Sequence, residues 1–156
     1  MYEAKTGVYT FCAPLQAGAV LAGADDAVVD ALRSAGLALG AAYQIADDLI
    51  GTFGDPAVTG KSIVSDAREG KQTVLATLVV ESGSQSAMEA AMRSARSIED
   101  AAAHLRALIE DTGARAAAVD LALARTREAG RHLLAVPAAL RAELEPLIDD
   151  LRDRVS

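Results

Sequence analysis

The feature that most constrains the fold of this chain is a long segment, residues 27–50, that contains no proline. Apolar residues recur there at intervals of three or four, which places their side chains on one face of an α-helix; they are Val28, Leu32, Ala35, Leu39 and Tyr43. We therefore predict a helix over residues 27–50. Gly23 and the pair Asp25–Asp26 precede it, and these residue types are typical of one helix ending and another beginning.

The rest of the chain has the same helical character. Of its 156 residues, 35 are Ala and only four are Pro, and aromatic residues make up 3%. Ala is the strongest helix former, whereas the β-branched and aromatic runs that favour sheets are scarce. The sequence thus predicts an all-α protein. Further helices are expected at residues 2–21, with Pro14 inside or at a joint, and at residues 65–81, 87–94, 97–111, 114–134 and 138–155.

Short polar or breaker-containing segments separate these helices. Residues 51–60 contain three Gly and Pro56 and are predicted to form a loop, and residues 82–86 to form a turn. The pairs Thr112-Gly113 and Val136-Pro137 mark two further breaks. Ser97 with Asp100 resembles a capping box at the start of a helix.

Charge, cysteine content and hydropathy exclude several classes of protein. The net charge of −7 argues against a broad surface that binds nucleic acid. A single cysteine, Cys12, cannot form an internal disulfide, which fits a reducing, cytoplasmic setting. The apolar run at residues 8–22 contains Pro14 and Gln16 and is too short to span a membrane, so we predict no membrane span and no signal peptide.

Two adjacent carboxylates near the end of the 27–50 helix are the first sign of chemistry. Gln44, Asp47 and Asp48 stand at i, i+3 and i+4 and therefore share one helix face. The two acids repel each other and also meet the negative end of the helix dipole. A divalent cation would relieve both penalties, and Mg²⁺ typically takes one or two carboxylates together with substrate phosphates. A solvated acidic helix end is the alternative.

The lysines form a second, independent signal. Among 15 basic residues only three are Lys, and all three precede residue 80: Lys5, Lys61 and Lys71. The Lys ammonium is a compact charge that suits phosphate, so the three would fit a diphosphate held near the Asp pair. Scattered surface lysines are the alternative interpretation.

Together these residues resemble the second aspartate-rich region of the trans-polyprenyl diphosphate synthases, the family of farnesyl and geranylgeranyl diphosphate synthases. That family's pattern is roughly F-Q-I-x-D-D-x-x-D-x-x-G-D-x-x-x-x-G-K, followed by D-x-x-x-G-K-x-T. The corresponding residues here are Tyr43-Gln44-Ile45, Asp47-Asp48, Gly54-Asp55, Gly60-Lys61, Asp66, Gly70-Lys71 and Thr73. The pair Lys5-Thr6 resembles the family's K-T motif.

The resemblance implies an antiparallel helical bundle of the isoprenoid synthase type, with residues 1–156 as the C-terminal portion of a single domain. It implies a transferase that condenses isopentenyl diphosphate with an allylic diphosphate. Asp47 and Asp48 would ligate Mg²⁺, and Lys5, Lys61 and Lys71 would bind the diphosphate. Lys5, Thr6 and Gln44 would serve catalysis, with Thr6 and Gln44 bordering the reacting carbons.

Two departures from the family pattern bear on activity. The third Asp of the motif is Gly51 here, and the family's first aspartate-rich motif does not occur in this sequence. We therefore expect the chain alone to be incomplete and inactive, and to form a homodimer or to join a partner chain that carries the first motif. A non-catalytic or regulatory subunit of a heteromeric synthase is the main alternative; a helical interaction module and a terpene cyclase fit the residues less well.

Overall fold

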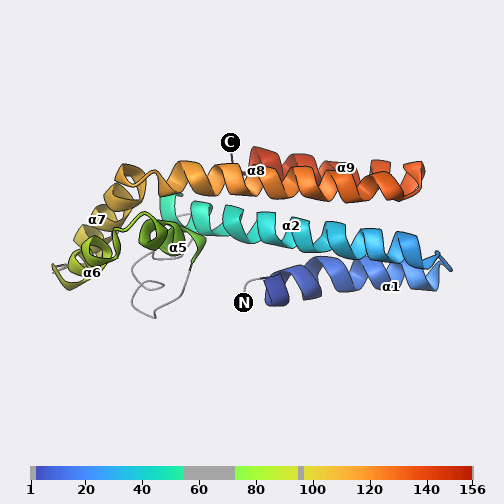
Figure 1. Ribbon diagram of the computed structural model, residues 1–156, viewed down its shortest axis with the longest axis horizontal. Helices are drawn as coiled ribbons and strands as arrows, with labels where there is room; N and C mark the ends of the chain where they lie inside the picture. Colours follow the sequence, from blue (N-terminus) through green and yellow to red (C-terminus); the bar gives the residue numbers. More distant parts are fainter. Residues whose placement is uncertain (1–2, 55–72, 95–96, 156) are drawn as a thin grey trace. The chain divides into compact units, whose positions relative to one another are not determined.

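The computed structural model describes residues 3–54, 73–94 and 97–155, and no strand occurs among them (Figure 1). The all-α prediction is thus confirmed for these residues. The chain divides into two compact units, which are described separately: Met1–Ala46 with Leu121–Ser156, and Asp47–Asp120. None of the described helices is long and apolar enough to cross a membrane.

The chain begins with two consecutive helical segments joined next to Pro14. Residues Glu3–Cys12 form the π-helix η1, and Ala13–Leu21 form α1 with Pro14 in its first turn. Proline lacks an N–H and its ring crowds the carbonyl four residues earlier, which accounts for the change of winding at this position. The predicted joint is confirmed. Gly23, at φ +72°, ends α1, where the N–H of Ala24 donates to the carbonyl of Ala19 (3.0 Å).

The long helix α2 spans Asp26–Phe53. Asp25 caps it as predicted, because its Oδ1 accepts a hydrogen bond from the N–H of Val28 (2.9 Å). The prediction that the loop begins at residue 51 is wrong, since α2 continues for three further residues, to Phe53. Packing explains the extension: Thr52 is buried, and tertiary contacts outweigh the poor helix propensity of Gly51.

The first unit has a core of small and branched apolar side chains. Its helices α1, α2, α8 and α9 lie side by side (Figure 1). Helices α1 and α2 are joined by a short turn and run antiparallel, and so do α8 and α9. Its centre consists of buried residues from α2, α8, the 3₁₀ turn that follows α8, and α9, among them Leu32, Leu39, Ala129, Leu133 and Ile148.

Two glycines of α2 allow η1 to approach unusually closely. A Cβ at Gly40 would overlap the Cα of Gly7, and one at Gly36 would lie 3.0 Å from the Cα of Cys12. Gly18, within the Ala/Gly-rich segment of α1, has no neighbour among the described residues within 4 Å of its Cβ position. The close helix contact in this unit thus depends on the glycines of α2.

The second unit contains α5 (Val74–Glu81), α6 (Gln85–Ser94) and α7 (Ile98–Asp111). Its core includes Leu49 from α2 and residues from α5 and α7: Leu75, Val79, Ala101, Leu105 and Ile109. The helix predicted at residues 65–81 is described from residue 74 onward, and residues 65–72 lie outside the described part. The N-terminal part of the predicted capping box is confirmed, because Ser97 Oγ accepts a hydrogen bond from the N–H of Asp100 (3.1 Å).

The C-terminal helices follow the predicted breaks. Helix α8 spans Ala114–His132 after Gly113, which has φ +73°, and a short 3₁₀ turn, η2 (Leu133–Ala135), closes it. Helix α9 (Ala138–Asp153) begins directly after Pro137. The predicted helix over residues 114–134 is therefore slightly too long, since its end tightens into the 3₁₀ turn.

Apolar side chains remain exposed on η1 and α1. Tyr9 is 77% exposed, Val20 63% and Leu21 89%. No charged residue occurs between residues 6 and 24. These side chains are candidates for contact with another chain.

Candidate metal and diphosphate site

The two adjacent aspartates lie in the last two turns of α2, at the start of the second unit. Asp48 contacts the beginning of α5: its Oδ2 accepts a hydrogen bond from the N–H of Val74 (3.1 Å). The first N–H groups of a helix have no partner within the helix and carry partial positive charge, so this position favours a carboxylate. The contact fixes the orientation of Asp48 toward α5.

Thr73 determines where α5 begins and thereby presents the Val74 N–H to Asp48. Thr73 has extended backbone angles, and its Oγ1 accepts a hydrogen bond from the N–H of Ala76 (3.1 Å). This is the arrangement of an N-cap residue. In the sequence, Thr73 closes the D-x-x-x-G-K-x-T stretch; in the structure it is the N-cap of the helix whose first N–H binds Asp48.

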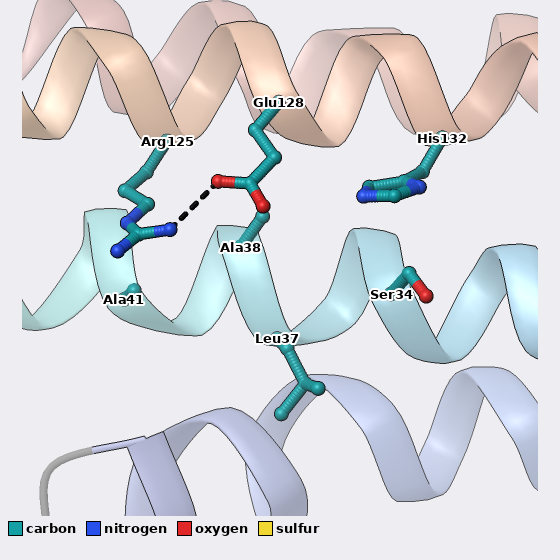
Figure 2. Close-up of a pocket in the computed structure, with 7 residues that line it drawn as sticks. All are labelled: Ser34, Leu37, Ala38, Ala41, Arg125, Glu128 and His132. Carbon is teal, nitrogen blue, oxygen red and sulfur yellow. Dashed lines mark hydrogen bonds and ion pairs between the residues drawn. The ribbon is translucent and has the colours of Figure 1, made fainter.

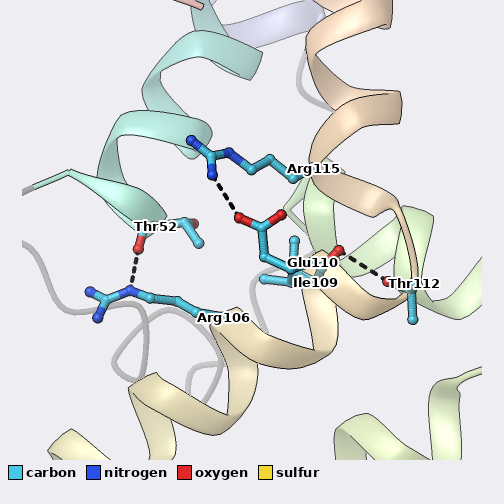
Figure 3. A network of polar contacts seen from close by, with 6 residues as sticks. All are labelled: Thr52, Arg106, Ile109, Glu110, Thr112 and Arg115. Carbon is cyan, nitrogen blue, oxygen red and sulfur yellow. Dashed lines mark hydrogen bonds and ion pairs between the residues drawn. The ribbon is translucent and has the colours of Figure 1, made fainter.

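Two arginines of the same unit contact the C-terminal end of α2, and Figure 3 shows one of these contacts, between Arg106 and Thr52. Arg106 Nε donates a hydrogen bond to the carbonyl of Thr52 (2.6 Å). The guanidinium carbon of Arg115 lies 4.4 Å from the centre of the Phe53 ring, and its Nη1 forms an ion pair with Glu110 (2.6 Å). Two cations thus lie at the negative end of the helix that carries the aspartates. Sequence analysis singled out neither arginine.

Only part of the predicted site falls within the described residues. Asp47 and Asp48 are adjacent on α2, and Gln44 lies one turn earlier on the same helix. Lys5 and Thr6 belong to η1, of which only the backbone is described at these positions. Lys61 and Lys71 lie outside the described residues, so their predicted contacts with a diphosphate stay predictions.

The donor set fits Mg²⁺ in its usual mode of binding. Within the described part of the chain, no three His, Cys, Asp or Glu side chains converge on a point where a metal ion would fit. Mg²⁺ does not need such a cage, because it keeps several waters and is held by one or two carboxylates plus substrate phosphates. The Asp47–Asp48 pair meets that requirement when a diphosphate supplies the remaining oxygens.

A separate pocket of about 210 Å³ lies in the first unit between α2 and α8 (Figure 2). Small residues of α2 form one wall, and the ion pair between Arg125 and Glu128 (2.8 Å) forms part of the other. Ser34 and His132 complete its polar lining. Of the predicted site residues, the three whose side chains the structure describes, Gln44, Asp47 and Asp48, do not line this pocket.

Comparison with known proteins relates the chain to one family. Residues 1–111 match the model of the polyprenyl synthetase family. A geranylfarnesyl diphosphate synthase from Aeropyrum pernix is 33% identical over 99% of this chain and 48% of its own length. A geranylgeranyl diphosphate synthase from Mycobacterium tuberculosis is 43% identical over 91 residues, which are 58% of this chain and 26% of its own.

Solved structures of polyprenyl synthases match almost the whole chain. One of them is a geranylgeranyl pyrophosphate synthase from Corynebacterium glutamicum, complexed with isoprenyl diphosphate and magnesium. It is 37% identical, with a TM-score of 0.81 over 96% of this chain and 44% of the other. The likeness confirms the predicted helical fold of the isoprenoid synthase type. The chain spans about half the length of the curated relatives that match nearly all of it.

Proposed function

Because the chain belongs to the polyprenyl synthetase family, we propose that it forms the side of a prenyltransferase site that binds an allylic diphosphate with Mg²⁺. The complete reaction joins this allylic diphosphate to isopentenyl diphosphate. In this proposal residues 1–156 are the C-terminal portion of a single synthase domain. The observation that carries the proposal is the Asp47–Asp48 pair on α2, with Asp48 oriented by the Val74 N–H.

The aspartates and lysines have complementary roles in this proposal. Asp47 and Asp48 provide oxygen ligands for Mg²⁺, and Lys5, Lys61 and Lys71 surround the diphosphate with positive charge. Mg²⁺ and lysines at the leaving group stabilise the negative charge that develops on the departing diphosphate. The resemblance to the family supports this division of roles, and so does the magnesium in the matching Corynebacterium glutamicum structure.

Thr6 and Gln44 act next to the reacting carbons. Each side chain carries an oxygen that can face developing positive charge on the allylic group or orient the proton lost afterwards. Gln44 is half-buried on α2, one turn before Asp47. This spacing along one helix supports a role beside the diphosphate end of the site.

Mg²⁺-dependent binding tests the proposal directly. Titration calorimetry of the chain with an allylic thiodiphosphate, a substrate analogue that resists cleavage, should show binding that EDTA abolishes. Asp47→Ala should weaken this binding, because it removes a ligand of the bridging metal. Asp149→Ala is the matched control: Asp149 is 69% exposed and pairs with Arg152 on α9. Equal affinity with and without Mg²⁺, or equal effects of the two substitutions, would contradict the proposed metal bridge.

The association state is a further part of the proposal. We propose that the chain acts as a homodimer or with a partner chain that carries the first aspartate-rich motif. The exposed Tyr9, Val20 and Leu21 support an association through η1 and α1. Incubated alone with isopentenyl diphosphate, farnesyl diphosphate and Mg²⁺, residues 1–156 should form no longer prenyl diphosphate, because productive reaction needs both substrates positioned together. Multiple turnovers by this chain alone would contradict the proposal.

The alternative, a non-catalytic subunit of a heteromeric synthase, rests on the same exposed surface. A partner with its own complete site would be active without this chain. A partner that becomes active only when this chain is added, and loses activity with Asp47→Ala, would instead support the catalytic role.

A further inference from the structure

The carbonyl of Thr52 is one of the last four in α2, which have no donor within their own helix. In a continuing helix the carbonyl of Thr52 would accept a hydrogen bond from the residue four positions later. That residue is Pro56, which has no N–H. Thr52 is 7% exposed, so its polar groups need partners from within the protein. The final turn is otherwise closed by the N–H of Gly54, which donates to the carbonyl of Ile50 (2.8 Å).

Arg106 supplies the missing partner from a helix that lies 54 residues further along the chain. Its Nε donates to the Thr52 carbonyl at 2.6 Å, a short hydrogen bond from a charged donor. The neighbouring face of α7 is fixed in the core by Ala101, Leu105 and Ile109, which are 1%, 4% and 6% exposed. The guanidinium group therefore comes from a rigid element (Figure 3).

We propose that Arg106 is a positioning residue for the metal-binding aspartates: by capping the end of α2 it holds the turns that carry Asp47 and Asp48. The proposal rests on the proposed function of that pair. Asp48 and Thr52 are four residues apart, about 6 Å along the helix axis. Fraying of the last turn would therefore loosen the backbone next to the aspartates.

Two contacts from different helices thus secure this part of α2. The Val74 N–H of α5 binds the Asp48 side chain, and Arg106 of α7 binds the Thr52 carbonyl. Partners of this kind, one step removed from a metal, fix the geometry of its ligands. Arg115 adds a further cation at the same helix end through its contact with the Phe53 ring. Since that side chain is 48% exposed, we assign the main anchoring role to Arg106.

The test compares Arg106→Gln with Arg106→Lys and with a matched control, Arg93→Gln. Arg93 belongs to the same unit but is 71% exposed and pairs only at the surface, with Glu89 (3.3 Å). Binding of the allylic thiodiphosphate is measured across Mg²⁺ concentrations. Arg106→Gln should raise the Mg²⁺ concentration for half-maximal binding by about 10-fold, with saturation still reached at high Mg²⁺. Arg106→Lys, which keeps a cationic donor, should recover part of the loss, and Arg93→Gln should match the unsubstituted chain.

Amide hydrogen exchange at Gly54 gives a readout that does not depend on ligand binding. Arg106→Gln should accelerate exchange of the Gly54 N–H, because the last turn of α2, which the hydrogen bond from this N–H to the Ile50 carbonyl closes, would open more often. Unchanged Gly54 exchange, or an unchanged Mg²⁺ requirement in a chain that binds diphosphate, would overturn the positioning role. Equal loss of binding at all Mg²⁺ concentrations together with loss of helical circular dichroism would also overturn it, because Arg106 would then be needed only for folding. An unsubstituted chain that binds no diphosphate, with faster Gly54 exchange in Arg106→Gln, would instead contradict the proposed function and leave Arg106 as a helix cap.

Discussion

The backbone N–H of Val74 donates a hydrogen bond to Oδ2 of Asp48 across 26 residues of sequence (3.1 Å). Asp48 therefore has a structural partner as well as a proposed metal-binding role. The charge of the side chain and its capacity to accept this hydrogen bond can be separated by substitution.

Asp48→Asn and Asp48→Ala should have different effects. Asn keeps an oxygen that can accept from Val74 but loses the charge, so it should weaken Mg²⁺-dependent diphosphate binding and leave stability nearly unchanged. Ala removes both functions, and the unpaired N–H at the start of α5 should cost about 1–2 kcal/mol more in the free energy of unfolding. Urea unfolding and calorimetry measure the two quantities. Equal stability of the two variants would show that the contact with Val74 contributes little.

Gly51 occupies the position of the third Asp in the family pattern, and the structure has space for a side chain there. Among the residues that the structure describes, none would lie within 4 Å of a Cβ at Gly51. Gly51→Asp adds a third carboxylate near the negative end of α2, so the variant should respond more strongly to Mg²⁺ than the unsubstituted chain. The measurement is the rise in Tm on adding Mg²⁺ with a diphosphate. Gly51→Ala, which gains only helix propensity, is the control; the same Mg²⁺ response in both variants would contradict the expectation.

Two glycines with opposite surroundings should respond oppositely to the same substitution. Gly40→Ala places a methyl group against the Cα of Gly7 and should destabilise the chain by about 1–3 kcal/mol. Gly18→Ala meets open space on α1 and should stabilise it by about 0.5–1 kcal/mol through better helix propensity. Chemical unfolding of both variants checks this. Destabilisation of similar size at the two positions would mean that the contact between η1 and α2 is not as close as described.

The exposed apolar residues of α1 should drive self-association of the isolated chain. Leu21 is 89% exposed, and Leu21→Lys should lower the apparent mass in light scattering. Lys is chosen because its positive charge makes the net charge of −7 less negative, which reduces repulsion between copies of the chain. Weaker association of Leu21→Lys could then not be attributed to increased charge repulsion. Ala116→Lys adds the same charge at an exposed site on α8 and should have no effect. An equal decrease in both variants would assign the effect to charge alone.

The single thiol should make stability depend on pH in the alkaline range. Burial raises the pKa of Cys12 above its ordinary value, and the charge of Arg33 opposes that rise in part. Above the pKa of a thiol in the unfolded chain, about 8.5, the unfolded chain loses this proton while the folded chain still holds it. The free energy of unfolding should therefore fall as the pH rises past that value. The urea midpoint of unfolding is measured at about pH 7 and at about pH 9.5. Its decrease between the two pH values should be larger for the unsubstituted chain than for Cys12→Ala. Parallel decreases would contradict the assignment.

Local signals in the sequence were sufficient for the helices and most of their ends. The joint at Pro14, the cap at Asp25 and the turn at Gly113 each follow from the chemistry of one residue and its neighbours. The end of α2 was predicted too early because the burial of Thr52 depends on residues distant in sequence. The spacing of apolar residues along the sequence does not reveal contacts between residues that are far apart in the chain.

The candidate site was likewise predictable only where it depends on residues close in sequence. The Asp pair was recognisable from its spacing on one helix, whereas the contacts that hold it, Arg106 with Thr52 and Val74 with Asp48, join segments 54 and 26 residues apart. Pro56 was the available clue, because its missing N–H leaves the Thr52 carbonyl without a helical partner. That clue predicts a need for a donor without indicating which residue provides it.

The close contact between Gly7 and Gly40 places its steric demand on one partner. A Cβ at Gly40 would overlap the Cα of Gly7, whereas a Cβ at Gly7 would lie 3.8 Å from Leu37, in ordinary contact, so glycine is required at position 40 of α2. Lys5 and Thr6 directly precede Gly7 along η1, so their backbone adjoins the point where η1 and α2 approach at Gly7 and Gly40, and the approach of Cys12 to Gly36 fixes the same helix further along. An insertion between Thr6 and Gly7 would therefore displace the Lys5-Thr6 pair and leave the helix contact intact.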